Sequence, residues 1–389
     1  MLRAGFTAIV FGAVLMAQSL SLAAFETRAT SAFVLDHTTG TVLLAKNADV
    51  PLPPASMSKL MTLYVAFEAV RDGRLKLDEE LRVSEHAMSY GGSTMFLQAG
   101  ERVKVADLIK GIIVLSGNDA CAVIAEALSP DGTEKGFSRF MTERAKDLGM
   151  SHSTFANSSG WPDADHRMSM RDLGILGAKI IEDFPEFYEL FAEKEFLFDK
   201  KESQNRYNRN PLLGLGIGAD GLKTGHTQEA GYGLVGSVKQ GERRIIFVIS
   251  GLETEQGRAR EAEAITNWAF RQFSTAELLK EGQIVAEAEV WMGEAATVAL
   301  TAATPLKTLL PTGRDGKVEA EVVYDGPLTA PVMAGATVGK LIIRPEGLAE
   351  TEVPLVAAST VAQGGVMVRL KTASQRVVKK LMAEAEGAL

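Results

Sequence analysis

The segment of residues 54–60, Pro-Ala-Ser-Met-Ser-Lys-Leu, places a serine and a lysine three positions apart. The prolines at 51, 53 and 54 disfavour helix, so a helix that follows them must begin at Ala55 or Ser56. In that helix Ser56 and Lys59 share one face, about 5–6 Å apart at their β-carbons, and the amine can take the proton of the hydroxyl. A helix start also favours negative charge on an attacking oxygen. The pattern predicts an activated serine nucleophile; the alternative is that Ser56 merely caps the helix.

Two further short motifs carry groups that could assist a serine. Ser116-Gly117-Asn118 interrupts a helical apolar pattern between residues 105 and 128, and Lys223-Thr224-Gly225 stands just before two strand-like runs. In a chain of this length Ser-x-x-Lys is expected about once by chance, and Lys-Thr-Gly in roughly one chain in ten. Ser-Gly-Asn could also be only a helix break whose side chains bind the local backbone. The signal therefore lies in the three motifs together.

Composition narrows the class of protein. The chain has 389 residues, which is enough for two or three domains. Its net charge is −8, and it has no block of Lys and Arg that would suit nucleic acid. Cys121 is the only cysteine, so an internal disulfide and a cysteine metal site are excluded. The five histidines are scattered, without a His-Glu-x-x-His pair, and a zinc hydrolase is not expected. We expect neither a metal nor a cofactor.

The N-terminus has the pattern of a secretory signal peptide. A short basic start and an apolar stretch over residues 4–17 precede small residues at 21, 23 and 24, which predicts a signal peptide over residues 1–23. The alternative is an uncleaved membrane anchor, which needs about 20 apolar residues. Gln18, Ser19 and Ser21 interrupt the run too early for that. We expect the protein to be exported.

Hydrophobic periodicity indicates the elements that would position the motifs. Apolar runs at 32–36 and 41–45, and again at 232–238 and 244–250, flank glycine-containing turns and predict two β-hairpins. Helical periods lie between the hairpins, so we expect one sheet built from the two ends of a domain. The predicted helices cover residues 56–70, 105–128 with its break, 137–148, 170–181 and 261–270.

The character of the chain changes after this unit. Short apolar runs punctuated by Gly and Pro predict a small all-β domain without a catalytic constellation. We expect a catalytic domain over residues 24–274, a β-rich domain over 275–368 and a C-terminal helix or tail over 369–389. Apolar and basic residues occupy opposite sides of that helix, as in an interfacial helix, although an ordinary solvated tail fits equally.

In their order and context, the three motifs resemble the active-site triplet of penicillin-recognising serine enzymes. Gly117 replaces the aspartate of the class A β-lactamases, and the flanking residues are similar to those of low-molecular-mass penicillin-binding proteins, above all D-alanyl-D-alanine carboxypeptidases. The resemblance covers nearly all of the chain after the signal peptide. It implies an α/β (α+β) catalytic domain of the serine transpeptidase/β-lactamase type, with an antiparallel sheet and a helical cluster, a small all-β domain and a short C-terminal helix. The tail departs from better-known members because it lacks their aromatic residues.

The resemblance implies roles for the motif residues. Ser56 would be the acylated nucleophile, and Lys59 the base, with a pKa depressed by burial and by the positive charge of Lys223. Ser116 would relay a proton to the leaving D-alanine amine. Asn118 would hold the substrate amide.

The resemblance also implies a binding strand. Lys223 and Thr224 would bind the terminal carboxylate of the substrate, and Gly225 would let the substrate backbone lie close. The amide N–H groups of Ser56 and His226 would form an oxyanion hole, which is worth roughly 3–4 kcal/mol per donor. Two arginines, Arg209 and Arg258, match family positions near the part of the site that binds the substrate carboxylate. The alternative is that they form surface ion pairs.

The resemblance implies a periplasmic D-Ala-D-Ala carboxypeptidase that trims peptidoglycan stem pentapeptides, is acylated by β-lactam antibiotics, and contacts the inner membrane peripherally through the C-terminal helix. A β-lactamase, a DD-endopeptidase and a non-catalytic wall-binding protein are the alternatives. A class A β-lactamase needs a glutamate that activates its deacylating water, and no residue between Asn118 and Lys223 is recognisable as that glutamate from the sequence. All three motifs are intact, which argues against a non-catalytic protein.

Overall fold

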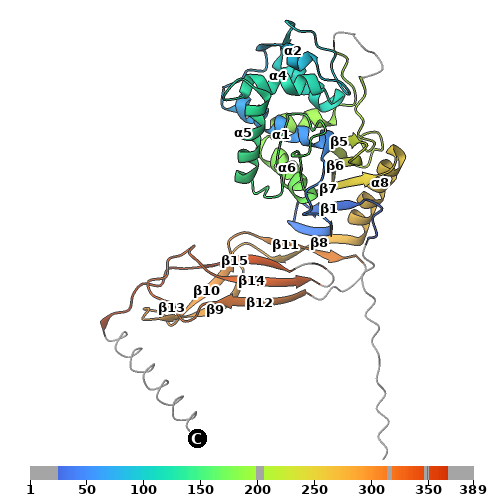
Figure 1. Ribbon diagram of the computed structural model, residues 1–389. Coiled ribbons are helices and arrows are strands. Elements are labelled where there is room, and N and C mark those ends of the chain that lie inside the picture. Colours follow the sequence, from blue (N-terminus) through green and yellow to red (C-terminus); the bar gives the residue numbers. More distant parts are fainter. Residues whose placement is uncertain (1–24, 199–205, 313–317, 346–347, 349, 367–389) are drawn as a thin grey trace, which may run out of the picture.

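The computed structural model describes residues 25–198, 206–312, 318–345, 348 and 350–366. The expected signal peptide at 1–23 and the expected C-terminal helix at 369–389 lie outside these residues. Figure 1 shows two bodies, one in which helices pack on a sheet and a second, elongated one made of strands. Within the described residues, no helix is both long and apolar enough to cross a bilayer.

The first body is organised around a five-stranded antiparallel sheet whose strand order is β2-β1-β7-β6-β5. The N-terminal hairpin therefore pairs with the hairpin formed about 200 residues later, with Phe33 opposite Val248. This confirms that the two ends of the domain build one sheet. The strands are β1 (Ser31–Asp36), β2 (Thr41–Lys46), β5 (Ala219–Thr227), β6 (Gly231–Gln240) and β7 (Arg243–Leu252).

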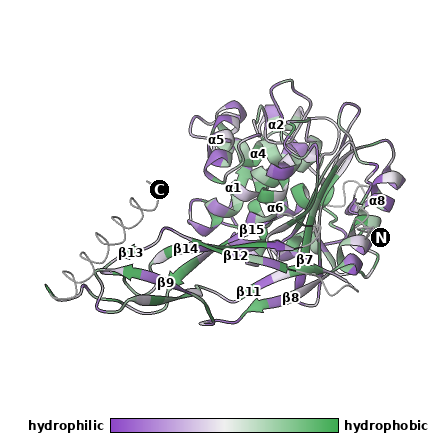
Figure 2. Ribbon diagram, turned by 90° about the horizontal axis from the view of Figure 1, so that it is seen from below, coloured by the Kyte–Doolittle hydropathy of each residue, from purple (hydrophilic) through white to green (hydrophobic). Residues whose placement is uncertain are grey.

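Both faces of this sheet are covered, so its central strands are buried on each side. Side chains alternate between faces along a strand: Val248 joins the core beneath the helical cluster, whereas Phe247 joins the core beneath α8 (Glu255–Gln272). This explains why β7 reads as a nearly continuous apolar run. Figure 2 shows the hydrophobic residues along these strands and the helices packed on them.

The helical cluster surrounds α1 (Lys59–Arg71), which follows the 3₁₀ turn η1 (Ala55–Ser58). Every residue from Lys59 to Ala69 is buried, as its all-round apolar sequence predicts. The other elements are β3 (Glu80–Arg82), α2 (Glu85–Met88), β4 (Arg102–Lys104), α3 (Val105–Lys110), the π-helical turn η2 (Gly111–Leu115), α4 (Asn118–Leu128), α5 (Glu134–Asp147), α6 (Met170–Asp183), α7 (Pro185–Tyr188) and η3 (Glu189–Ala192).

Two elements differ from what the hydrophobic pattern predicts, although the family resemblance does place Lys223 and Thr224 on a strand. Lys223-Thr224-Gly225 lies within strand β5 rather than before the strands, because pairing with β6, with Lys223 opposite Val235, imposes a strand on a segment of low β-propensity. Helix α8 begins at Glu255, six residues before the predicted start at 261, with Thr254 Oγ1 accepting from Gly257 N. Its first turns are polar and have no apolar period to detect.

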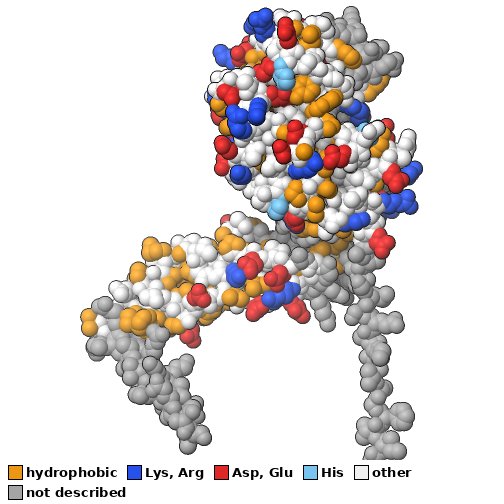
Figure 3. All heavy atoms as spheres, in the orientation of Figure 1, with side chains coloured by type: hydrophobic (Ala, Val, Ile, Leu, Met, Phe, Trp, Pro, Cys, Tyr) orange, Lys and Arg blue, Asp and Glu red, His pale blue; other side chains and the backbone are white. Residues whose placement is uncertain are grey.

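The second body is all β, as predicted. Its main sheet has the order β12-β14-β15-β10-β9-β13, and a separate pair, β11-β8, adjoins it in sequence. Leu300, Ile343 and Leu355 are among the residues of its small core. Figure 3 shows charges of both signs interspersed over the face in view. The strands are β8 (Phe273–Leu279), β9 (Ile284–Trp291), β10 (Thr297–Ala302), β11 (Leu306–Pro311), β12 (Val318–Tyr324), β13 (Leu328–Thr329), β14 (Thr337–Pro345) and β15 (Thr351–Ala357).

Candidate active site

Ser56 lies in η1, one turn before the lysine that faces it. Lys59 Nζ donates a hydrogen bond to Ser56 Oγ at 2.9 Å. No side chain caps the start of η1 or of α1, so the alternative that Ser56 is only an N-cap does not describe this hydroxyl. The proline run ends the preceding segment, and the helix starts where the sequence predicts.

The amine of Lys59 is fully buried, with acceptors on three sides. Besides Ser56 Oγ, Nζ donates to Asn118 Oδ1 at 2.7 Å and to the carbonyl oxygen of Ser159 at 2.6 Å. Burial, with a smaller contribution from the charge of Arg209, lowers the pKa of Lys59 to about 8. Arg209, rather than the expected Lys223, is thus the cation that most depresses the pKa of this base.

Ser116 and Asn118 stand at the break between η2 and α4. Ser116 adopts the left-handed conformation, with φ of 62°, and its buried hydroxyl has no hydrogen-bond partner among the described residues. Asn118 Nδ2 donates to the carbonyl of Gly91 at 2.8 Å, which turns its Oδ1 toward Lys59. These contacts hold the predicted helix break in a defined conformation. π-Turns and strained non-glycine residues occur frequently at functional sites.

Strand β5 brings the second lysine to the same place. Lys223 is buried, and among the described residues its amine donates only to the carbonyl of Thr224, at 3.2 Å. Burial, Arg209 and Lys59 hold its pKa well below the usual value. Two residues after Lys223, Gly225 packs against Pro54, Ala55 and Met57, so Lys223 and the segment that bears Ser56 and Lys59 lie on the same side of the molecule.

Close packing explains why a glycine stands at position 225. A β-carbon there would lie 2.9 Å from the carbonyl oxygen of Pro54 and 3.0 Å from Met57 Cγ. The position of a β-carbon at Gly225 is therefore taken by η1, and Gly225 lets β5 pack directly against the segment that bears Ser56. The next residue, His226, is exposed and stacks its ring on Tyr232, with centroids 3.9 Å apart.

The two arginines lie behind β5 and η2. Arg209 donates to Ser93 Oγ and to the carbonyl of Leu115, each at 2.9 Å, and so ties a loop to the residue before Ser116. Arg258 is only 3% exposed and donates to the carbonyl of Arg209 at 3.2 Å as well as to Glu255 at 2.9 Å. A surface ion pair does not describe Arg258, because its guanidinium is buried.

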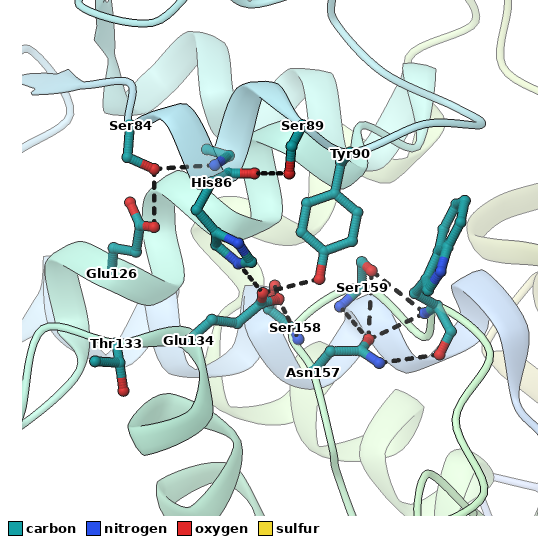
Figure 4. Close-up of polar contacts among 12 residues, drawn as sticks. Ser84, His86, Ser89, Tyr90, Glu126, Thr133, Glu134, Asn157, Ser158 and Ser159 are labelled. Atoms are coloured by element: carbon teal, nitrogen blue, oxygen red, sulfur yellow. Dashed lines mark hydrogen bonds and ion pairs between the residues drawn. The ribbon is translucent and has the colours of Figure 1, made fainter.

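Sequence reasoning did not single out the turn of residues 157–161. The Ser159 carbonyl accepts from Lys59, and the Ser158 carbonyl accepts from Thr62 Oγ1 at 2.6 Å. Asn157 Oδ1 accepts from the backbone N–H groups of three residues of the turn. Figure 4 shows its contact with Ser159. The Asn and Gly of this segment signal a turn, but nothing local shows that it meets α1. Within the described residues no cluster of His, Cys, Asp and Glu could hold a metal.

A serine at the start of a buried helix, a lysine one turn on, and a lysine on the edge strand of an antiparallel sheet define the class of penicillin-recognising serine enzymes. Residues 17–254 match the family model described as D-alanyl-D-alanine carboxypeptidase, and residues 273–363 match that of the penicillin-binding protein 5 C-terminal domain. The chain belongs to the D-alanyl-D-alanine carboxypeptidase family. It is a serine peptidase.

Individual relatives cover most of the chain. D-alanyl-D-alanine carboxypeptidase DacC of Escherichia coli is 36% identical over 87% of this chain and 85% of its own length. Penicillin-binding protein 5 of Haemophilus influenzae has a solved structure that superposes with a TM-score of 0.78 at 33% identity, covering 87% of this chain and 99% of that one. Penicillin-binding protein D2 of Listeria monocytogenes, solved in an ampicillin-bound form, covers 62% of this chain and 97% of that one, with a TM-score of 0.56 and 32% identity.

Proposed function

We propose that this protein is a D-Ala-D-Ala carboxypeptidase that removes the terminal D-alanine from peptidoglycan stem pentapeptides through an acyl-enzyme on Ser56. One observation carries the proposal: the partner set of Lys59 Nζ. Asn118 Oδ1 and the Ser159 carbonyl can only accept hydrogen bonds, so a neutral amine must donate to both. Its lone pair is then left facing Ser56 Oγ, the one partner that carries a proton.

The reaction follows from this arrangement. Lys59 takes the proton of Ser56 as Oγ attacks the carbonyl carbon of the penultimate D-alanine, and the amide N–H groups of Ser56 and His226 hold the developing oxyanion. Ser116 passes a proton to the amine of the departing D-alanine. Water then attacks the ester and releases Ser56 and the shortened peptide. A pKa of about 8 leaves enough neutral amine near neutral pH for the first step.

Recognition of the substrate would use the other half of the site. Asn118 would hold the substrate amide, and Lys223 and Thr224 would bind the terminal carboxylate, with Arg209 and Arg258 adding positive potential behind them. Burial favours loss of the proton from Lys223, and an incoming carboxylate would reverse this, because an opposite charge favours the charged amine. The same cations fit the carboxylate of a β-lactam, so we propose that β-lactams acylate Ser56; the ampicillin-bound Listeria relative supports this.

The other candidate activities fit less well. Glu134 is a buried carboxylate and therefore a candidate for the base that a β-lactamase needs. However, it accepts four hydrogen bonds. Despite the opposing effect of burial, those bonds lower its pKa, so it suits an anchor better than a base for water. A DD-endopeptidase would use the same chemistry on crosslinked peptides. A non-catalytic wall-binding protein would not need a buried lysine beside the serine.

We further propose export to the periplasm with residues 1–23 as signal peptide, and peripheral contact of residues 369–389 with the inner membrane. The proposed boundary between the catalytic and β-rich domains lies at residue 274. It is supported by the direct passage from α8, which ends at Gln272, into β8, which begins at Phe273.

Labelling of the mature protein with a fluorescent penicillin tests the nucleophile. Wild type should be labelled and Ser56→Ala should not. Ser58→Ala is the matched control, since Ser58 lies in the same turn but is hydrogen bonded to His166 at 2.7 Å. Equal labelling of wild type and Ser56→Ala would remove the nucleophile assignment.

Release of D-alanine from diacetyl-lysyl-D-Ala-D-Ala tests the activity. We expect release by wild type together with a long-lived penicillin adduct. Rapid turnover of the drug without D-alanine release would instead favour a β-lactamase, and release only from crosslinked dimers would favour an endopeptidase.

A further inference from the structure

Glu134 is a buried carboxylate behind the turn of residues 157–161 (Figure 4). It stands in the first turn of α5, where a negative charge is favoured. Its Oε1 accepts from the backbone N–H of Ser158 at 2.8 Å and from Ser158 Oγ. Its Oε2 is hydrogen bonded to His86 Nε2 at 2.7 Å and accepts from Tyr90 OH at 2.8 Å. A single carboxylate thus joins α2, α5 and the turn.

The turn that Glu134 holds contacts Lys59 and the segment that bears Ser56. The residue after Ser158 supplies the carbonyl that accepts from Lys59 Nζ at 2.6 Å. Gly160 packs so closely that a β-carbon there would lie 1.9 Å from the carbonyl oxygen of Ala55, next to Ser56. A displacement of Ser158 would therefore alter the partner set of Lys59 and the packing of the serine segment together.

Glu134 also acts on Lys59 through charge. The groups that face the amine are the cation Arg209, which lowers its pKa, and Asp119, Cys121 and Glu134, which raise it. Lys223 lies in the same site, but its own pKa is lowered. Removal of the charge of Glu134 would consequently lower the pKa of Lys59, whereas removal of its hydrogen bonds would loosen the turn. The two effects have different signatures.

We propose that Glu134 is a positioning residue for acylation: it fixes the turn of residues 157–161, whose Ser159 carbonyl orients the amine of Lys59 toward Ser56. This inference rests on the proposed role of Lys59 as base. Among the described residues, the carboxylate of Glu134 is hydrogen bonded to Ser158, His86 and Tyr90, and not to Ser56 or Lys59. A cavity of about 840 Å³ opens beside Glu134 and is lined by His86, Tyr90 and Trp161 among others. The hydrogen bonds of Glu134 with His86 and Tyr90 therefore lie at the wall of this cavity.

The test compares Glu134→Gln with Glu134→Ala by the second-order rate constant of penicillin acylation across pH. In Glu134→Gln the side-chain oxygen can still accept from Ser158, so the plateau should fall less than about threefold, while the acid limb moves to lower pH because the charge is gone. In Glu134→Ala the turn loses its anchor, and the plateau should fall about tenfold or more, in line with the loss of buried hydrogen bonds.

Glu126→Gln is the matched control, because Glu126 lines the same cavity and accepts from Ser84 Oγ at 2.8 Å without contact to the turn. It should leave both plateau and acid limb unchanged. The amplitude of labelling counts the folded molecules, so each rate constant refers to competent protein only. If Glu134→Ala yields too little folded protein, Ser158→Ala replaces it, since it removes one of the two bonds from Ser158, and a smaller fall of the plateau is expected.

Two results would overturn the proposal. One is an acid limb in Glu134→Gln that coincides with those of wild type and Glu126→Gln. The other is a plateau in Glu134→Ala, or in Ser158→Ala if it replaces that variant, equal to that of wild type. Failure of the proposed function itself looks different: wild type would not be labelled at all, or Lys59→Ala would be labelled as fast as wild type.

Discussion

Ser116 combines two costs that a merely structural serine would avoid. A left-handed backbone at a non-glycine residue costs roughly 1–2 kcal/mol, and a buried hydroxyl without a partner costs about 1–3 kcal/mol. Both are present here. Because Ser116 lies between the Arg209-bound carbonyl of Leu115 and the Lys59-bound Asn118, the neighbouring contacts hold it in this conformation.

His166 provides a second buried polar group next to the site, and it titrates. Ala156 N donates to His166 Nδ1 at 3.3 Å, so the ring proton sits on Nε2 and is donated to Ser58 Oγ at 2.7 Å. Burial lowers the pKa of His166 from 6.5 to about 4. The fold therefore stabilises the neutral ring.

The sign of the resulting pH dependence follows. Above pH 6.5 the contribution of His166 to stability is complete. As the pH falls from 6.5 toward about 4, the unfolded chain binds the proton first, and the free energy of unfolding should fall by about 3 kcal/mol. Urea unfolding of wild type and of His166→Asn between pH 7 and about 4 measures this difference. His152→Asn, at an exposed histidine, is the control and should keep the wild-type slope; an equal slope in His166→Asn would contradict the prediction.

At the scale of elements, close approach of backbone decides the geometry of the site. The turn of residues 157–161 and strand β5 both press on η1, and each does so through a glycine, Gly160 or Gly225. The nucleophile segment is thus held between two elements whose contacting glycines, Gly160 and Gly225, are 65 residues apart in the chain. A short 3₁₀ turn with Ala55 at φ 48° would have little reason to persist alone.

A pair of glycine substitutions separates backbone strain from this packing. Gly160 and Gly149 both have positive φ, 78° and 84°, so alanine at either should cost roughly 1–2 kcal/mol of stability. A β-carbon at Gly149 meets nothing within 4 Å, whereas one at Gly160 would collide with the carbonyl oxygen of Ala55. Gly149→Ala should keep the wild-type acylation rate, and Gly160→Ala should lower it about tenfold or more.

The measurements are the penicillin acylation rate constant and urea unfolding of both variants. Both variants should lose stability, Gly160→Ala by more because its β-carbon also collides with Ala55, and only Gly160→Ala should be acylated more slowly. Equal acylation rates in the two variants would show that contact of the turn with η1 does not matter for the reaction.

At the scale of the whole molecule, the two bodies are joined without a linker. Arg243, at the start of β7, forms a buried ion pair with Asp36 and donates from Nη1 to the carbonyl of Phe273 at 2.6 Å. The ring of Phe273 packs edge-on against Trp268 of α8 at 5.4 Å between centroids. Phe273 thus completes the first body although it begins the first strand of the second.

Truncation tests the proposed domain boundary. A protein of residues 24–274 retains Phe273 and all of α8, so it should fold and be acylated within about threefold of the full-length rate, because no described residue of the candidate site lies beyond Arg258. A protein ending at 262 loses Ile265 and Ala269, both fully buried against the sheet, and should fail to fold. Circular dichroism and penicillin labelling check both. An unfolded or unlabelled 24–274 protein would show that the β-rich domain belongs to the catalytic unit.

Several features of this protein follow from its sequence alone. The proline run places the start of the helix, the all-round apolar pattern predicts that α1 is buried, and alternation with turn residues predicts both hairpins. These are local properties, in which propensity and period act over a few residues. The order of the three short motifs is likewise readable, and it suffices to indicate the family to which the chain belongs.

Only the tertiary structure decides how these pieces make one site. Strand β5 takes its conformation from pairing with β6, and the turn of residues 157–161 meets Lys59 across a separation of 100 residues. Burial most depresses the pKa of that lysine, and Arg209 is the cation that adds to it. None of these contacts leaves a periodic or propensity signal in the chain. Burial and long-range electrostatics depend on distances between segments, and those distances are set only when the sheet and the helical cluster pack.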